Sequence, residues 1–240
     1  MSESPLVRKL RTVADLNADE VDALNALSKR VERIKRRDDI ISEGDRPEFV
    51  HLMIEGWAAR YKILPDGSRQ IMAILIPGDF CDLHVTILGE MDHGIVALSP
   101  CKVAYVVPGD LDALTSENSR LARALWWATL LDEGVLRSWI VSVGRRDAHE
   151  RVAHLLCEMH TKMTMIGLVH GDRLALPLTQ DELADATGLT SVHVNRTLQQ
   201  LRSENLIEIG SGSLTVLDVA RLRDAAGFNP NYLHAKRQIR

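Results

Sequence analysis

The chain has 240 residues, 45% of them hydrophobic and 26% charged, which is the composition of a globular protein with one large or two ordinary domains. No apolar run approaches a membrane span and the N-terminus lacks a signal-peptide core, so we expect a cytoplasmic protein with no membrane partner. The net charge of −4 argues against a strong non-specific nucleic-acid binder, and three distant cysteines are unlike a disulfide framework.

The first half of the chain is rich in predicted strands. Residues 16–30 predict a short amphipathic helix capped by Asn17 or Asp19. Short runs rich in Val, Ile and aromatic residues then alternate with Gly and Pro turns: Asp39–Ser42, Glu48–Ile54, Trp57–Leu64, Gln70–Ile76, Ile95–Leu98 and Lys102–Val107. This regular spacing predicts a sandwich or barrel, with a hairpin turn at Pro65-Asp66-Gly67-Ser68.

The pattern becomes helical after Pro108. A small helix is predicted at Leu111–Thr115 and a long one from Glu117 to Gly144. The long helix has a heptad-like seam with one acidic residue on it: Leu121, Leu125, Ala128, Asp132, Val135 and Trp139. We interpret it as a dimerisation helix, in which the polar residue fixes register or oligomeric state. The alternative is a helix that packs on its own β domain.

The C-terminal part contains a predicted winged helix-turn-helix. A further helix is expected at about Asp147–Met163, after a hinge at Gly144-Arg145-Arg146-Asp147. Thr179 and Glu182 then form a capping box, Gly188 permits a tight turn, and Thr190 or Ser191 caps a second helix. Two short strands around Gly210-Ser211-Gly212 predict a wing: Ile207–Ile209 and Ser213–Leu217. The alternative reading of the helices is a hairpin in a core.

The second helix predicts a DNA-reading surface. It offers short polar groups and one guanidinium, which are the groups that read base edges in the major groove. The expected DNA-binding residues, including the caps of both helices, are Thr179, Gln180, Thr190, Ser191, Val192, His193, Asn195, Arg196 and Gln199. Three domains are therefore expected: a β-rich domain at 1–116, to which the family resemblance given below assigns a sensor role, a dimerisation helix at 117–144 and a DNA-binding domain at 145–240.

The chain resembles the Crp/Fnr superfamily of bacterial transcription regulators over essentially its whole length. The resemblance is carried by Gly56–Arg60, Leu64–Ile71, Pro77–Phe80 and the helix-turn-helix. It implies an α+β fold: an N-terminal cyclic-nucleotide-binding-type β-roll (a jelly roll), a long dimerisation helix and a C-terminal winged helix-turn-helix. It also implies a homodimer that binds a palindromic site in double-stranded DNA, works with RNA polymerase at promoters and is not an enzyme.

The effector loop departs from the family pattern. Cyclic-nucleotide-binding members have Gly-Glu-Leu and then Arg-Ser or Arg-Thr, where this chain has Cys81-Asp82-Leu83 and Asp92-His93-Gly94. Asp82 can still accept from a ribose, but the loop offers no guanidinium for a phosphate, and Glu90 and Asp92 oppose an anion. We predict no cyclic-AMP dependence and no cofactor. An unknown small molecule or none is expected at the pocket candidates Cys81, Asp82, Leu83, His84, His93 and Gly94.

Other sensing modes remain as alternatives. Cys81 and His84 are similar to the haem ligands of the carbon-monoxide-sensing branch, but are spaced Cys-x-x-His where that branch has Cys-x-His. The iron–sulfur branch needs N-terminal cysteines, and none precedes Cys81. No tight ligand spacing predicts a metal site. A cupin-like metalloenzyme needs converging histidines, whereas His51, His84 and His93 are scattered. A signal-binding module with a C-terminal part that contacts only protein is a further alternative.

The recognition helix departs from the family as well. Members of the family have a glutamate where this chain has Val192, which can make only apolar contact, for example to a thymine methyl. Arg196 occupies the family's arginine position, and we expect it to make a bidentate contact to guanine. The half-site should therefore differ from the family's common ones while it keeps that guanine.

Overall fold

The computed structural model describes residues 3–83, 85–210 and 212–234. It divides into two compact units, the first made of Met1–Lys62 and Ala73–Glu133 and the second of Ile63–Met72 and Gly134–His234. In the described part of the chain, none of the helices is both long enough and apolar enough to cross a membrane.

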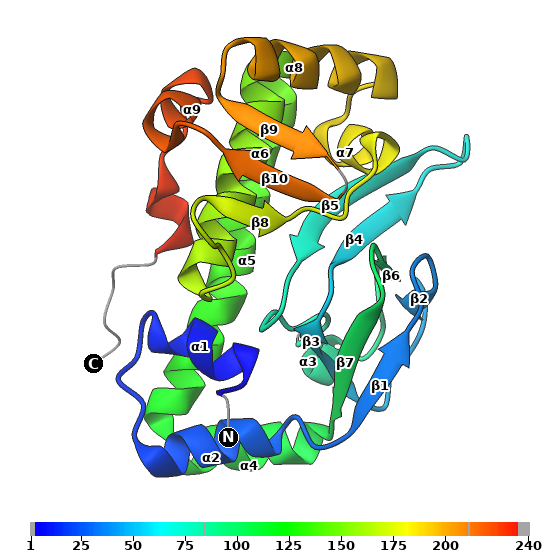
Figure 1. Ribbon diagram of the computed structural model, residues 1–240. Coiled ribbons are helices and arrows are strands. Elements are labelled where there is room, and N and C mark those ends of the chain that lie inside the picture. The colour runs from blue at the N-terminus through cyan, green and yellow to red at the C-terminus, as the bar shows by residue number, and fades with distance from the viewer. Residues whose placement is uncertain (1–2, 84, 211, 235–240) are drawn as a thin grey trace. The chain divides into compact units, whose positions relative to one another are not determined.

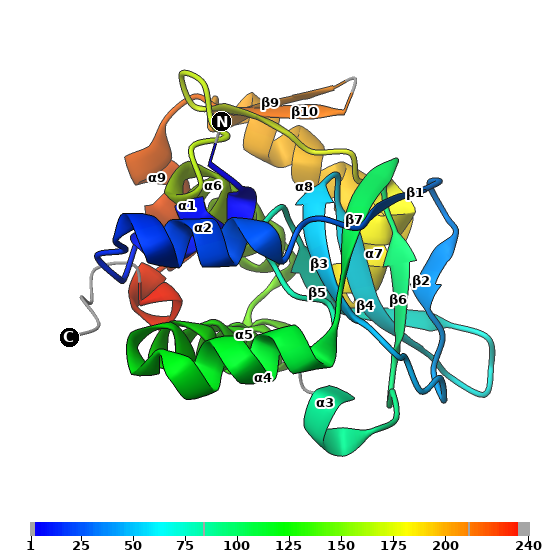
Figure 2. The same cartoon turned by 90° about the horizontal axis from the view of Figure 1, so that it is seen from below.

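The first unit contains the β-roll except for the hairpin segment of residues 63–72, which belongs to the second unit. The strands can be followed in Figure 2. One antiparallel sheet has the strand order β1-β7-β3, and a second has the order β2-β6-β4-β5. Their registers place Val31 opposite Ala104 and Ala58 opposite Ala97. The strands are β1 Val31–Ile34, β2 Asp39–Ile41, β3 Val50–Glu55, β4 Ala58–Ile63, β5 Arg69–Leu75, β6 Gly94–Ala97 and β7 Cys101–Val106.

Two turns show how the sequence fixes this roll. At the β4–β5 hairpin, Asp66 Oδ1 accepts a hydrogen bond of 2.9 Å from the backbone N–H of Ser68, and Gly67 has a φ of +83°. Both are features that the residues of this turn favour. Gly56 has a φ of +88°, and a Cβ there would lie 2.9 Å from the Cα of Cys101. A glycine is therefore required where β3 turns into β4.

The helices of the first unit enclose and extend the roll. They are α1 Pro5–Arg11, α2 Ala18–Ala26, α3 Val85–Leu88, α4 Pro108–Glu117 and the first half of α5 Ser119–Arg145. Asn17 caps α2 in a capping box with Glu20. On α1, Leu6 and Leu10 are fully buried, and Lys9 Nζ lies 2.6 Å from Asp79 Oδ1. The aspartate of the Pro-Gly-Asp-Phe motif therefore anchors α1.

The second unit is a winged helix-turn-helix (Figure 1). Asp147 begins its first helix with a capping box to Glu150. A three-stranded antiparallel sheet has the order β8-β10-β9. The elements are α6 Ala148–Met165, β8 Arg173–Ala175, α7 Gln180–Thr187, α8 Ser191–Ser203, β9 Ile207–Gly210, β10 Ser213–Val216, α9 Val219–Ala225 and the 3-10 helix η1 Pro230–Leu233.

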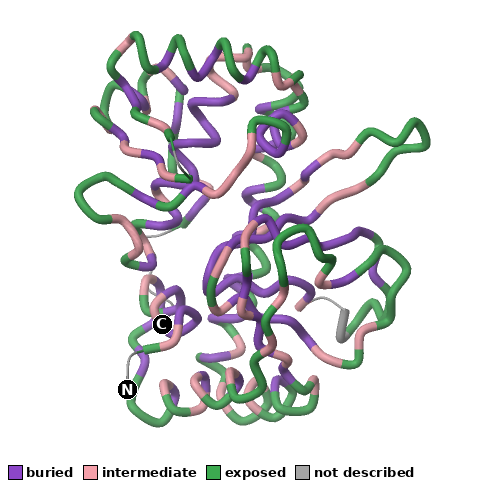
Figure 3. The backbone as a smooth tube through the Cα atoms, turned by 45° about the vertical axis from the view of Figure 1, so that its right-hand side comes forward, coloured by how far each residue is buried: buried purple, intermediate pink, exposed green. Residues whose placement is uncertain are grey.

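The expected fold class is confirmed: a β-roll, helices and a C-terminal helix-turn-helix occur in that order. The six predicted strands and the two wing strands are present with small shifts of their ends. Ser211 of the wing turn lies outside the described residues. The small helix predicted at Leu111–Thr115 extends over all of α4, and α1 and β1 were not predicted. Figure 3 shows the alternation of buried and exposed positions along these elements.

Candidate nucleic-acid interface and effector pocket

The turn between α7 and α8 is set by local hydrogen bonds. Thr179 Oγ1 accepts from the N–H of Glu182 at 3.1 Å, and a Glu182 carboxylate oxygen accepts from the N–H of Thr179 at 2.7 Å. Gly188 ends α7 with a φ of +64°, in the left-handed region. Thr190 Oγ1 then accepts from the N–H of His193 at 3.3 Å and begins α8. The predicted capping box and turn glycine are confirmed.

The exposed face of α8 carries the predicted base-reading residues. Val194, Leu198 and Leu201 are buried and hold the helix on its unit. The side chains on the opposite face are exposed, with Ser191 half-buried at the edge: Val192, His193, Asn195, Arg196 and Gln199. Val192, Arg196 and Gln199 follow one another at spacings of four and three, so they lie on one line along the helix. In a major groove, Val192 can contact a thymine methyl, Arg196 a guanine and Gln199 an adenine.

The helix caps are placed beside this face. Thr190 and Gln180 are exposed and Thr179 is half-buried. The two threonine hydroxyls already accept backbone N–H groups, but each keeps its O–H hydrogen as a donor. Such donors suit phosphate oxygens at helix N-termini better than they suit base edges.

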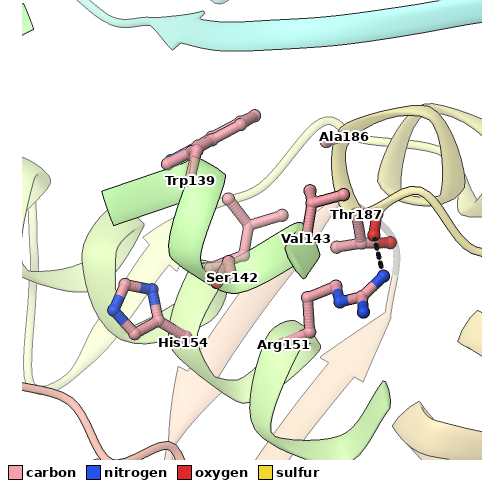
Figure 4. A pocket seen from close by; sticks show the side chains of 8 residues that line it. Trp139, Ser142, Val143, Arg151, His154, Ala186 and Thr187 are labelled. Atoms are coloured by element: carbon pink, nitrogen blue, oxygen red, sulfur yellow. Dashed lines mark hydrogen bonds between the residues drawn. The ribbon is translucent and has the colours of Figure 1, made fainter. Parts of the chain in front are cut away.

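Arg151 of α6 ties the hinge after α5 to the turn of the helix-turn-helix. Its guanidinium donates to the carbonyl of Thr187 at 2.8 Å (Figure 4) and to the carbonyl of Arg146 at 2.9 Å. A cavity of about 10 Å³ lies beside it, between Trp139, Ser142 and His154. That volume is about what one water requires. The hinge, α6 and α7 are therefore joined through one side chain.

Asp82 does not point to a ligand site. Its side chain is fully buried, and its carboxylate accepts from the backbone N–H of His51 at 2.7 Å. The other carboxylate oxygen lies 2.8 Å from His51 Nδ1. The His51 ring in turn meets Tyr105 edge-on, with centroids 4.6 Å apart. The expectation that Asp82 could accept from a ribose is therefore corrected, because both of its oxygens are engaged inside the roll.

Arg60 was not predicted as a pocket residue, because the family pattern places the guanidinium in the loop. It comes from β4, is 9% exposed, and donates to the carbonyls of Phe80 and Cys81 at 2.9 and 3.1 Å. It also donates to Asp132 of α5 at 2.9 Å. Burial opposes the charge on Arg60, but the Asp132 carboxylate raises the pKa of the guanidinium above its usual value. The pocket candidates at the loop are thus linked to α5 by a partly buried ion pair.

The other pocket candidates are arranged as follows. Leu83 is half-buried, and His84 lies outside the described residues. His93 is buried, with Nδ1 2.5 Å from Asp92 Oδ1, and burial lowers its pKa. A Cβ on Gly94 would clash with the Tyr61 ring. Glu90, expected to oppose an anion, pairs with Arg46 at 2.8 Å.

Cys81, the cysteine of this loop, is shielded from solvent. Cys81 is fully buried, and burial followed by the neighbouring Asp82 charge raises the pKa of its thiol well above the usual value. A thiol held in the protonated form is a poor metal ligand. Among the residues that the structure describes, no group of three His, Cys, Asp or Glu side chains is placed to hold a metal ion.

The predicted seam of α5 faces inward. Five of its side chains are buried, and Trp139 is the most exposed of these at 7%. Asp132 is held by Arg60. The expectation that the seam Leu121, Leu125, Ala128, Asp132, Val135 and Trp139 forms a free dimer surface is therefore corrected, because its five apolar side chains are covered within the chain and Asp132 is paired with Arg60.

A second line of residues on α5 is exposed instead. It repeats every four and three positions, as the first seam does, but on another face of the helix. Trp126, Leu130 and Ile140 are 76%, 56% and 72% exposed. We call this line the α5 stripe: Trp126, Leu130, Glu133, Arg137 and Ile140.

Two family models match the chain. Residues 31–118 match the cyclic nucleotide-binding domain, and residues 150–225 match the Crp-like helix-turn-helix domain. The first match covers the roll, with the loop that contains Cys81, and the second covers α6 to α9. These matches agree with the two halves of the fold.

Relatives and solved structures are similar over most of their length. The nitrogen fixation regulation protein FixK of Bradyrhizobium diazoefficiens is 28% identical over 220 residues, covering 92% of this chain and 91% of the relative. The transcriptional activatory protein AadR of Rhodopseudomonas palustris is 29% identical over 216 residues, covering 90% and 88%. The structure of FixK2 from Bradyrhizobium japonicum has a TM-score of 0.73 and 27% identity, and the match covers 81% of this chain and 96% of that chain.

Proposed function

This chain belongs to the Crp/Fnr family of transcription regulators, and from that premise we propose that it binds a two-fold symmetric promoter site as a homodimer that needs no effector. Members of this family regulate transcription and are not enzymes. The observation that carries the proposal is the exposed line on α8, with Val192, Arg196 and Gln199 side by side. An apolar group, a guanidinium and an amide in that order can distinguish base pairs in a major groove.

Within this interface, Arg196 takes a guanine and Val192 takes a thymine methyl. His193, Asn195, Gln199 and Ser191 supply further base or phosphate contacts. Thr190, Thr179 and Gln180 donate to phosphates at the two helix N-termini. These contacts place α8 in the major groove and fix its register.

The homodimer uses the α5 stripe. A helix face with Trp126, Leu130 and Ile140 exposed at heptad spacing is suited to pair with its own copy about a two-fold axis. Glu133 and Arg137 lie between the apolar residues of the stripe and supply opposite charges that can set register. The dimer brings two copies of α8 to half-sites about one helical turn, ~34 Å, apart.

Effector independence rests on the Arg60–Asp132 pair. A buried guanidinium already links the loop at Phe80 and Cys81 to α5, a connection that a bound ligand would otherwise have to make. Asp82 is likewise engaged by His51. Inside the roll, side chains of the chain itself therefore make the contacts that a bound effector would otherwise make.

The remaining assignments follow from the same premise. We propose a sensor-type domain at 1–116, a dimerisation helix at 117–144 and a DNA-binding domain at 145–240. We place the protein in the cytoplasm, where a promoter-binding regulator meets both its DNA and RNA polymerase, its further partner.

The test is selection of purified full-length protein against a randomised duplex pool with no effector added. We expect a two-fold symmetric site with a guanine in each half-site. The matched variant Arg196→Ala should lose about 1–3 kcal/mol at that base pair and keep its other preferences. A failure to enrich any sequence would contradict the regulator proposal, and a uniform loss in the variant would make Arg196 a phosphate contact.

The effector claim is tested by repeating the binding measurement with saturating cyclic AMP. We expect the same site and the same affinity. A gain of more than about ten-fold would show coupling of over 1 kcal/mol between the roll and the DNA site, and would overturn effector independence.

A further inference from the structure

The segment after α9 lies beyond the matched helix-turn-helix, which ends at residue 225. It runs through residues 226–234 and includes η1. Phe228 is 8% exposed and Leu233 is fully buried, so buried side chains anchor the segment near both of its ends. Figure 1 shows it in red, returning from α9 beside α5 and α6.

The segment touches the backbone of α5. A Cβ built on Gly134 would lie 2.9 Å from the carbonyl oxygen of Tyr232. That distance is shorter than ordinary van der Waals contact, so only glycine lets η1 approach α5 this closely. The second half of α5 thus offers a notch at Gly134 in which the backbone of Tyr232 sits.

A buried carboxylate joins the segment to both helices. Glu158 of α6 is fully buried, and its oxygens accept from Trp139 Nε1 of α5 at 3.0 and 3.2 Å. The Tyr232 hydroxyl donates to Glu158 Oε2 at 2.7 Å. A carboxylate inside a protein is tolerated only when such donors hold it. Moving α5 or the segment away from α6 would remove one of these two donors from a buried carboxylate, so Glu158 ties all three together.

Aromatic rings around this carboxylate pack against one another. His154 of α6 lies edge-on to Phe228 at 5.0 Å and stacks on Tyr232 at 5.9 Å between centroids. Phe228 and Tyr232 meet edge-on at 6.0 Å. These are the separations at which ring pairs attract one another. The segment therefore holds α6 by packing as well as through Glu158.

We propose that residues 226–234 form a strap that fixes the angle between α5 and α6, with Tyr232 as a positioning residue for DNA recognition by α8. The hinge at Arg146 and Asp147 lies between the two helices, and α6 packs against α7 and α8. A strap on both sides of the hinge holds α8 in one orientation before DNA is met. The consequence for DNA rests on the proposed homodimer; the strap itself does not.

The first test measures the hinge directly. Trypsin cleaves after Arg145 and Arg146, and mass spectrometry identifies the fragments. Tyr232→Phe keeps the ring and removes only the hydroxyl that Glu158 accepts. We expect cleavage at the hinge to accelerate about ten-fold, and by less than about two-fold in the control Asn231→Ala, an exposed neighbour on η1. Equal rates in Tyr232→Phe and the wild type would overturn the strap.

The second test separates positioning from stability. Full-length protein is titrated with duplexes in which the spacer between half-sites is changed by one base pair at a time. We expect the wild type to prefer one spacing and Tyr232→Phe to lose about ten-fold of that preference. A variant that is only less stable would bind every spacing less well by the same factor, and that outcome would overturn the positioning role. If the homodimer proposal is wrong, the wild type itself shows no preference for one spacing. The trypsin experiment still tests the strap in that case, because it does not depend on DNA binding.

Discussion

Arg60 and Lys9 carry charge into the interior of the roll, and each meets a carboxylate there. Burying a charge costs several kcal/mol unless a partner and hydrogen bonds compensate for it. The charge of Arg60 is compensated by Asp132 and by two backbone carbonyls, and the charge of Lys9 is compensated by Asp79. At the residue scale, these contacts secure segments that are far apart in the sequence.

Replacing Arg60 with Met should lower the free energy of unfolding by about 3–5 kcal/mol, because Asp132 and the carbonyls lose their donor. Urea denaturation measures the change. The matched control is Arg46→Ala, which breaks the exposed pair with Glu90 and should cost under about 1 kcal/mol. Equal losses in the two variants would show that Arg60–Asp132 contributes no more than a surface pair. The double variant Arg60→Met, Asp132→Leu should recover most of the loss.

His154 should make the stability of the second unit depend on pH. Burial, and then the nearby Arg146 charge, lower its pKa from 6.5 to about 4. The unfolded chain therefore takes up a proton that the folded chain refuses between these values. Stability is fully present above pH 6.5 and falls as the pH drops toward 4, by about 1.4 kcal/mol per pH unit.

Urea denaturation at pH 7 and pH 4.5 tests this expectation. Compared with the wild type, His154→Gln should lose less stability between the two pH values, by about 2–3 kcal/mol. Carboxyl groups also titrate in this range in both proteins, so the test compares the loss of stability in the variant with the loss in the wild type. Identical pH dependence in the two proteins would assign the effect to those groups.

Single residues also mark how far the sequence could predict the site. Thr179, Glu182 and Gly188 act through neighbours within a few positions, so their pattern was sufficient to find the helix-turn-helix. Arg60 meets Asp132 across 72 positions and Tyr232 meets Glu158 across 74. No local pattern encodes such pairs, because the fold alone decides which distant side chains meet.

At the scale of elements, α5 shows why periodicity can mislead. Two lines of residues at spacings of four and three run along the same helix. Leu121, Leu125 and Val135 are buried on one, while Trp126 and Ile140 are exposed on the other. The sequence reveals the period of each line but not which of them the chain covers itself. That choice is made by tertiary packing.

The α5 stripe should control dimer formation. The double variant Leu130→Glu, Ile140→Glu places like charges on the stripe of each copy and should shift the protein to monomer in sedimentation velocity, with at least about a ten-fold weaker dimer. The control Thr129→Glu adds one charge on an exposed neighbour and keeps every apolar residue of the stripe. A double variant as dimeric as the wild type would place the interface elsewhere.

The missed elements have physical explanations. β1 is an edge strand with the sequence VERI, and the four residues after it, Lys35 to Asp38, are all charged, so it lacked the apolar signal of a central strand. α1 is short and rich in basic residues, and Lys9 is buried only because Asp79 receives it. Both depend on partners that a local window does not contain.

At the scale of the whole molecule, all three cysteines are free and buried. Burial raises the pKa of the Cys157 thiol to about 12, and the pKa values of Cys81 and Cys101 are also raised. Because the thiolate is the reactive form, the folded protein should resist thiol reagents and oxidants.

Labelling with a thiol-reactive disulfide at pH 8 tests this resistance. In the time that the unfolded chain needs to react completely, under about one-tenth of the thiols should react in the folded protein. DNA affinity measured after the treatment should be unchanged. Rapid modification of any one cysteine in the folded state would reveal an opening that the structure does not contain.

The α5 stripe also has a consequence for dosage. When the species that binds DNA is a dimer and most chains are monomers, its amount grows with the square of the chain's concentration, so doubling synthesis raises it about four-fold. If the proposed dimer forms and needs no effector, transcription, translation and proteolysis of this chain become the signal. Dimerisation through the exposed Trp126 and Ile140 then makes the amount of DNA-binding species rise more steeply than the supply of chains.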